Sequence, residues 1–248
     1  MNGKEIIEKH LKYNLQSWSA QGGLRPKAIE KADNIYLWDY DGNRYTDMSA
    51  QLVNMNLGHR NREIGEAIKK QVDQFCFMAP SYAVESRSLL AEKIIGLLPE
   101  NMGKVFFTNA GADANENAIK MARMYTGRNK VMSRYRSYHG SSFGAGNLTG
   151  EPRRFPLEPG IPGFIKFFDP YVYREKISFG SEEEAGAYYV EKLREQILYE
   201  GADSIAAIVM ETITGSNGVI IPPKNYLPGV RKLCDEYGIM MICDEVMA

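Results

Sequence analysis

The sequence predicts an α/β fold whose sheet is mostly parallel and covered by helices on both faces. Short segments made almost wholly of apolar residues, such as 206–211 and 239–245, have the length and composition of strands buried on both sides. Segments with helical periodicity separate them, and strands that alternate with helices are typical of parallel sheets. With 248 residues, 44% of them hydrophobic, the chain can bury the core that such a fold requires.

The first 58 residues differ in character from the rest. A short helix is expected over 5–14, and residues 34–48 alternate β-type residues around Asp41-Gly42, which predicts a β-hairpin. We therefore expect residues 1–58 to form an N-terminal segment and residues 59–248 to form the main domain.

The main domain is expected to alternate helices and strands. Two helical segments open it, and a strand then leads directly into the next helix. Residues 146–164 are rich in glycine and proline and are expected to form a surface loop, whose length favours a functional role. The predicted helices are 62–75, 86–98, 113–125, 182–199 and 225–237, and the predicted strands are 104–109, 130–135, 206–211 and 239–245.

Composition excludes several classes of function. The net charge of -1 gives no basic surface for nucleic acid or an anionic membrane, so the expected partners are small molecules or protein. No apolar stretch approaches the roughly 18 to 20 residues that cross a bilayer, and the charged N-terminus does not resemble a secretory signal, so a cytoplasmic location is expected. Cys76, Cys234 and Cys243 lack C-x-x-C spacing, so neither a disulfide framework nor a metal site is indicated.

Ligands of open α/β sheets bind at the carboxyl ends of the strands, and four such ends carry candidate residues. After strand 104–109, Gly111 and Ala112 begin a helix whose free amides suit a phosphate group, although an ordinary strand-to-helix turn has the same pattern. After strand 130–135, Tyr138 is suited to stack on a flat ligand, and His139 follows it. A surface tyrosine and a loop histidine are the alternative interpretation.

The other two strand ends carry carboxylates. Glu211 and Asp244 each follow an apolar strand, where a buried carboxylate needs a partner. The pair could bind a metal, act as acid and base, or hold a cationic group of a ligand. A strand ending in Asp-Glu also fits the Walker B pattern, but the G-x-x-x-x-G-K-[ST] motif is missing, and so are G-x-G-x-x-G, H-E-x-x-H and G-x-S-x-G.

Taken together, four segments resemble the class III (ω-amino acid) aminotransferases, which are pyridoxal-phosphate (PLP) enzymes of fold type I. These segments are "TNAGADANENAIKMAR", "RYRSYHG", "VMETITGSNGVIIPP" and "CDEVMA". The resemblance extends to "DGNRYTDMSAQLVNMNLGHRNREIGEAI" near the start of the chain. It implies that residues 1–58 are part of the small domain and that residues 59–248 are an incomplete large PLP-binding domain.

The resemblance implies a role for each candidate. Gly111 and Ala112 would bind the cofactor phosphate, and Tyr138 and Val246 would cover the two faces of the pyridine ring. Asp244, the implied catalytic carboxylate, would hold the protonated ring nitrogen, which keeps the ring cationic and able to take up electrons. Glu211 would order the polar network beside the ring, and His139 would support the same region or serve in packing.

Substrate contacts are implied less specifically. Leu52 and Val53 match the family's substrate-pocket wall, and Arg154 or its neighbour Arg153 is a candidate for an acidic substrate group. Loop arginines in contact with solvent are the alternative interpretation. The partners would be a small-molecule amino donor of the taurine or β-alanine kind and an oxo-acid acceptor such as pyruvate or 2-oxoglutarate, in a homodimer. The same cofactor pocket also serves mutases, epimerases and decarboxylases.

One family residue has no match. The lysine that forms the Schiff base follows the aspartate by roughly thirty residues in this family, whereas no lysine follows Lys232 here. The 248 residues therefore correspond to about the first half of an aminotransferase. Taken alone, we expect them to be a non-catalytic fragment with a cofactor half-site.

Overall fold

The computed structural model describes residues 1–247, and it divides into two compact units, residues 1–103 and residues 104 onward. Each unit is described by itself. The sequence places the domain boundary after residue 58, and the assignment of residues 59–103 to the large domain stays a prediction.

The first unit contains the predicted helix and hairpin. Helix α1 (Gly3–Tyr13) begins with a capping box, in which Asn2 and Glu5 exchange side-chain and backbone hydrogen bonds. Strands β1 (Ile29–Asp33), β2 (Tyr36–Asp39) and β3 (Arg44–Thr46) form an antiparallel sheet in that order. Gly42 in the β2–β3 turn has a φ of +84°, which a residue without a Cβ adopts at little cost.

Helices complete the first unit. Helices α3 (Arg62–Gln74) and α4 (Glu85–Ile95) confirm the two periodic segments. The segment labelled α2 (Ala50–Val53) is unusual, because all four of its residues have φ between +46° and +64°, the left-handed region that side chains with a Cβ disfavour.

The second unit is built on a parallel sheet of four strands. Their order is β5 (Phe164–Phe167), β4 (Lys130–Arg134), β6 (Ile205–Glu211) and β7 (Met240–Asp244). Helix α5 (Gly111–Thr126) leads into β4, α7 (Glu182–Glu200) lies between β5 and β6, and α8 (Tyr226–Tyr237) lies between β6 and β7. These three helices confirm the predicted helical segments. The remaining elements are α6 (Phe143–Leu148) and the 3-10 turns η1 (Gln21–Gly23), η2 (Pro152–Leu157), η3 (Val172–Arg174) and η4 (Ala202–Ser204).

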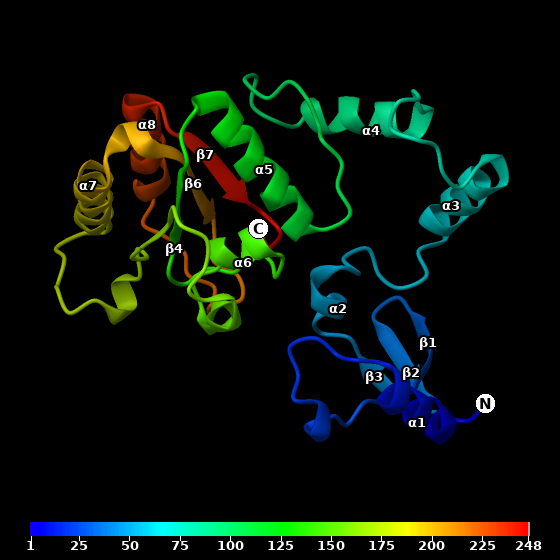
Figure 1. Ribbon diagram of the computed structural model, residues 1–248. Coiled ribbons are helices and arrows are strands. Elements are labelled where there is room, and N and C mark those ends of the chain that lie inside the picture. The colour runs from blue at the N-terminus through cyan, green and yellow to red at the C-terminus, as the bar shows by residue number, and fades with distance from the viewer. Residues whose placement is uncertain (248) are drawn as a thin grey trace. The chain divides into compact units, whose positions relative to one another are not determined.

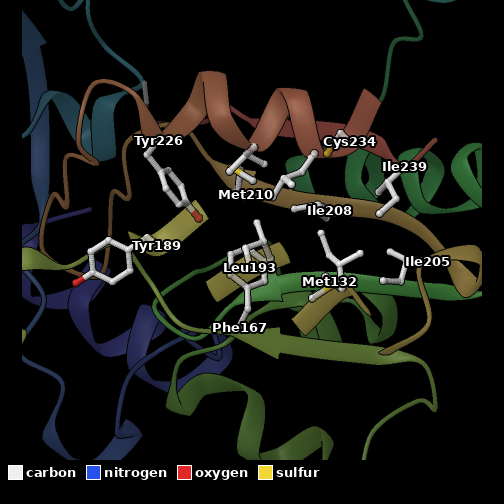
Figure 2. Close-up of a cluster of buried hydrophobic side chains, with 13 residues drawn as sticks. Met132, Phe167, Tyr189, Leu193, Ile205, Ile208, Met210, Tyr226, Cys234 and Ile239 are labelled. Atoms are coloured by element: carbon white, nitrogen blue, oxygen red, sulfur yellow. The ribbon is translucent and has the colours of Figure 1, made fainter. Parts of the chain in front are cut away.

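Successive residues of the central strands face opposite layers of helices. Ile208 and Met210 of β6 pack with Leu193 of α7 and with α8, and Figure 2 shows this cluster between the sheet and the helices. Ala207 and Val209, one position away, pack with α5 on the other face. Both faces of the sheet are therefore covered (Figure 1), which explains why β6 is apolar at every position but its last and wholly buried.

One predicted strand was wrong, and one strand was missed. Residues 104–109 form no strand, because an extended segment becomes one only when a neighbour accepts its hydrogen bonds, and no strand of residues 1–247 does so. Conversely, strand β5 was missed, since Lys166 interrupts a very short apolar run. The predicted surface loop 146–164 contains η2 and begins in the core, where Leu148 and Thr149 are buried.

Candidate functional site

Three strand ends and one helix start meet at the carboxyl edge of the parallel sheet. Glu211 and Asp244 lie opposite each other in the register of β6 and β7. The loop after β4 approaches α5 so closely that a Cβ on Gly140 would lie 2.6 Å from the Cβ of Ala112. Gly140 also has a φ of +124°, so this close approach depends on glycine. Figure 1 shows β7 ending beside the start of α5.

Asp244 is a buried carboxylate with two side-chain donors. Its Oδ2 atom lies 2.8 Å from Nδ1 of His139 and 2.9 Å from Nδ2 of Asn115, and its residue is 8% exposed. Burial alone would raise the pKa of Asp244, but the hydrogen bonds from His139 and Asn115 outweigh it and lower the pKa below its ordinary value. Asp244 is therefore held as an anion.

His139 is completely enclosed and is oriented by its neighbours. Because an ionised carboxylate can only accept, the Nδ1 atom that faces Asp244 carries a proton. The Nε2 atom is buried and has no hydrogen-bond partner among residues 1–247. The backbone of His139 is fixed on both sides, since its N–H donates to Oγ1 of Thr149 and its carbonyl accepts from Asn115. The structure thus brings His139 against Asp244, and its role beside the cofactor stays a prediction.

Glu211 joins two loops at the same edge. Its Oε1 accepts the backbone N–H of Tyr138 at 3.0 Å, and its Oε2 accepts that of Gly215 at 2.7 Å. Its carbonyl accepts a hydrogen bond from the buried guanidinium of Arg134. A carboxylate that is 4% exposed and accepts two amides is well suited to hold these loops in one arrangement.

The two candidate arginines have different surroundings. The guanidinium carbon of Arg153 lies 3.8 Å from the centre of the Tyr138 ring, close enough for a cation–π interaction. Arg153 also pairs with Glu151 and donates to Ser216. Arg154 instead pairs with Glu158 at 3.1 Å, within the same turn of the chain.

The start of α5 has the features of an anion site. Its N-cap residue, Ala110, has no side chain that could accept from the first-turn amides, which include those of Gly111 and Ala112. A Cβ built on Gly111 would lie 3.3 Å from Cγ2 of Val246, so the segment after β7 passes directly beside this helix start.

The remaining candidates, Leu52 and Val53, belong to the first unit. Both are exposed and lie in the left-handed segment. Their role as the wall of a substrate pocket stays a prediction.

Two residues of the site were missed by the sequence analysis. Asn115 and Thr149 are both buried and both fix His139. Asn115 could have been recognised from the sequence, because it falls on the same helical face as the buried Ile119 and Ala122, where a polar side chain requires a partner. No sequence pattern marks Thr149, since threonine is ordinary in a loop that is rich in glycine and proline.

Neither a metal cluster nor a membrane-spanning helix occurs in the described part of the chain. It contains no cluster of three or more His, Cys, Asp or Glu side chains that could hold a metal ion. It also contains no helix with the length and hydropathy needed to span a membrane.

Comparison with known proteins decides the family. The model of the family described as aminotransferase class-III matches residues 19–248, which is most of the chain. The chain belongs to the class-III aminotransferases. Its fold is accordingly that of PLP-dependent transaminases, with a partial large domain.

Among solved structures, the taurine:2-oxoglutarate aminotransferase from Bifidobacterium kashiwanohense, in complex with PLP and glutamate, is similar. It has 54% sequence identity and a TM-score of 0.94 over 98% of this chain and 55% of that one. This neighbour and the family support PLP as the cofactor.

Curated relatives in the family include enzymes of two kinds. The taurine–pyruvate aminotransferase of Bilophila wadsworthia is 31% identical over 98% of this chain and 54% of its own length. The leucine/methionine racemase of Thermococcus litoralis is 31% identical over 100% of this chain and 56% of its own. The chain spans about half the length of the curated relatives it matches.

The residues of this class-III chain fit PLP chemically. A buried aspartate held as an anion is the partner that a protonated pyridine nitrogen requires, and the first turn of α5 offers amides for a phosphate. Both features lie at one edge of the sheet, since Asn115 connects α5 to Asp244 directly.

Proposed function

We propose that the whole protein is a PLP-dependent transaminase that moves an amino group from an acidic amino donor, of the taurine or β-alanine kind, to pyruvate or 2-oxoglutarate. The observation that carries this proposal is the buried, doubly hydrogen-bonded carboxylate of Asp244 beside the start of α5. The similarity to taurine aminotransferases supports the donor class. A homodimeric state and a cytoplasmic location belong to the same proposal.

Each residue of the site has a distinct task in this proposal. Asp244 keeps a proton on the cofactor's ring nitrogen, and the amides of Gly111 and Ala112 bind its phosphate. Tyr138 and Val246 restrict the plane of the ring. The bound cofactor supplies an electron-poor ring that stabilises the carbanion left when a substrate C–H bond breaks.

For the acidic group of the donor we favour Arg153 over Arg154. Each arginine is paired with a nearby glutamate, Arg153 with Glu151 and Arg154 with Glu158, but Arg153 also lies against the ring of Tyr138, a residue of the candidate site. In the full-length protein, Arg153→Ala should raise KM for taurine much more than for an uncharged amine of similar size. Arg154→Ala is the matched control and should leave both values nearly unchanged.

The 248 residues alone can test the cofactor site. Equilibrium dialysis should show one PLP bound per chain. Asp244→Asn should weaken PLP binding by about 10- to 100-fold, which corresponds to the loss of one hydrogen bond to a charged group. Asp235→Asn, a change to an exposed carboxylate of α8, is the matched control. Equal binding by both variants would contradict the assignment of Asp244.

The same chain can test the proposal that these residues alone are non-catalytic. Borohydride added to the PLP complex should leave no stoichiometric covalent adduct, since no lysine follows Lys232. A stable, reducible one-to-one adduct would overturn that part of the proposal.

A second candidate function is a racemase or epimerase, which the similarity to the leucine/methionine racemase favours. The full-length protein separates the two activities. A transaminase consumes the amino donor only when an oxo acid is present, whereas a racemase inverts an amino acid without one.

A further inference from the structure

Helix α6 is held in place by a carboxylate of a neighbouring helix. Oε1 of Glu116, in α5, accepts from the Ser142 hydroxyl at 2.6 Å, the Gly144 amide at 2.7 Å and the Ala145 amide at 3.1 Å. These groups form the start of α6, where free amides need an acceptor. A Cβ on Gly144 would lie 2.2 Å from this carboxylate, so the close contact depends on glycine at this position.

The other end of α6 is held from the sheet. Nζ of Lys166, in β5, donates to the Leu148 carbonyl at 2.9 Å and also to that of Asn147. These are the last two carbonyls of α6. A carboxylate at the start of a helix and an ammonium group at its end both interact favourably with its dipole. Figure 1 shows α6 beside the start of α5 and below β7.

The residue that follows α6 connects it to the candidate site. Thr149 is 1% exposed, and its N–H donates to Ala145 in α6 at 3.0 Å. Its Oγ1 lies 3.1 Å from the Ala145 carbonyl and 3.2 Å from the Gly140 carbonyl, and it accepts the backbone N–H of His139 at 3.0 Å. The Thr149 hydroxyl thus bridges the end of α6 and the loop that contains His139.

We propose that Thr149 is a positioning residue, which holds the ring of His139 against Asp244, and that the contact of Glu116 with α6 holds Thr149 in place. Among residues 1–247, Asp244 is the hydrogen-bond partner of the His139 ring, because the Nε2 atom has none, so the remaining hydrogen bonds that orient His139 are those of its backbone. Asn115 holds the carbonyl of His139, and Thr149 holds its N–H. The consequence for cofactor binding rests on the proposed function, whereas the geometric part does not.

Nuclear magnetic resonance of the histidine rings tests the geometric part without cofactor. The chain contains three histidines, His10, His59 and His139. His139 faces its aspartate through Nδ1, whereas His59 faces Asp47 through Nε2, so the two rings should show opposite tautomers in their 15N chemical shifts. His59 therefore serves as an internal reference.

Thr149→Val removes the hydroxyl and keeps the shape. We expect it to abolish the single Nδ1–H tautomer of His139 and to leave the His59 signals unchanged. Thr149→Ser should retain the wild-type spectrum. Thr126→Val is the matched control, because Thr126 makes a similar bond to Ala122 at the far end of α5.

The PLP affinity provides an independent readout. Thr149→Val should weaken PLP binding about fivefold or more, the usual effect of losing a buried hydrogen bond, and Thr149→Ser should change it by less than about twofold. If Thr149→Val does not fold, Glu116→Gln should produce the same loss of the His139 tautomer through α6.

The outcomes separate the two proposals. Unchanged His139 signals in a folded Thr149→Val or Glu116→Gln variant would overturn the positioning role. Disturbed His139 signals in a chain whose wild type binds no PLP would support the positioning role and contradict the proposed function.

Discussion

Asn115 and Asp244 are 129 residues apart in the sequence, yet their side chains lie 2.9 Å apart and both are buried. Asn115 uses its second amide hydrogen for the His139 carbonyl, so one side chain connects α5, the β4 loop and the end of β7. The arrangement of the site thus depends on a helix residue that does not itself carry out chemistry.

Asn115→Leu should destabilise the chain by about 1.5–3 kcal/mol, because Asp244 loses a donor while its charge stays buried. Urea unfolding at neutral pH measures the change. The control is Asn117→Leu, two positions along the same helix, where the side chain bonds only to Asp113 near the surface. That variant should lose under about 1 kcal/mol, and equal losses in both would contradict the role of Asn115.

The sequence predicted the second unit largely because its strands are buried on both faces. Residues 205–211 have no position that faces water, so the strand is visible as an apolar run and its last residue, Glu211, is recognisable as a site candidate. The family resemblance then assigned Tyr138, His139 and Asp244 to one site, and the structure brings His139 and Asp244 into contact.

What the sequence could not predict depends on contacts between distant segments. Residues 104–109 have the composition of a strand, but composition does not supply a neighbour with which to pair. Thr149 was not recognised because its role comes from the fold, which brings His139 against it, and not from any local pattern. The left-handed turn at Ala50–Val53 was also missed, since none of its residues is a glycine or an asparagine.

Gly140→Ala should disturb the site more than an ordinary glycine substitution. A new Cβ at position 140 would lie 2.6 Å from the Cβ of Ala112, and the alanine would also have to adopt a φ of +124°. Gly218→Ala is the matched control, because Gly218 has a φ of +111° and open space around it. We expect about 1–2 kcal/mol of destabilisation for Gly218→Ala from the backbone alone and at least about 2 kcal/mol more for Gly140→Ala. Urea unfolding of both variants gives the difference, and equal losses would show that the loop can move away from α5.

Lys166 should make the stability of the chain depend on pH above neutrality. Burial and the nearby charge of Arg154 lower the pKa of Lys166 to about 7, below the value of 10.5 in an unfolded chain. Between these two values the unfolded state binds more protons, so stability should rise with pH, by at most roughly 1.4 kcal/mol per pH unit. The free energy of unfolding of Lys166→Met, measured by urea titration between pH 7 and 9, should lack this rise. Lys192→Met, at an exposed lysine of α7, should retain it.

Asp39 should titrate far below an ordinary aspartate. Hydrogen bonds from the side chains of Asn43 and Tyr45 lower its pKa to about 2, although burial opposes them. Because this pKa is below the unfolded value of 3.8, the ionised carboxylate stabilises the hairpin fully above about pH 4, and the effect is lost as the pH falls through 2.

The backbone N–H of Asn43 reports this titration directly, since it donates to Oδ1 of Asp39 at 2.8 Å. Its chemical shift should change with a midpoint near pH 2 in the wild type. Tyr45→Phe removes the 2.7 Å bond from the Tyr45 hydroxyl and should move the midpoint up toward 3.8. Tyr40→Phe, which changes a tyrosine of the same hairpin beside Asp39, should leave it in place. A wild-type midpoint near 3.8 would mean that the carboxylate is not held in this network in solution.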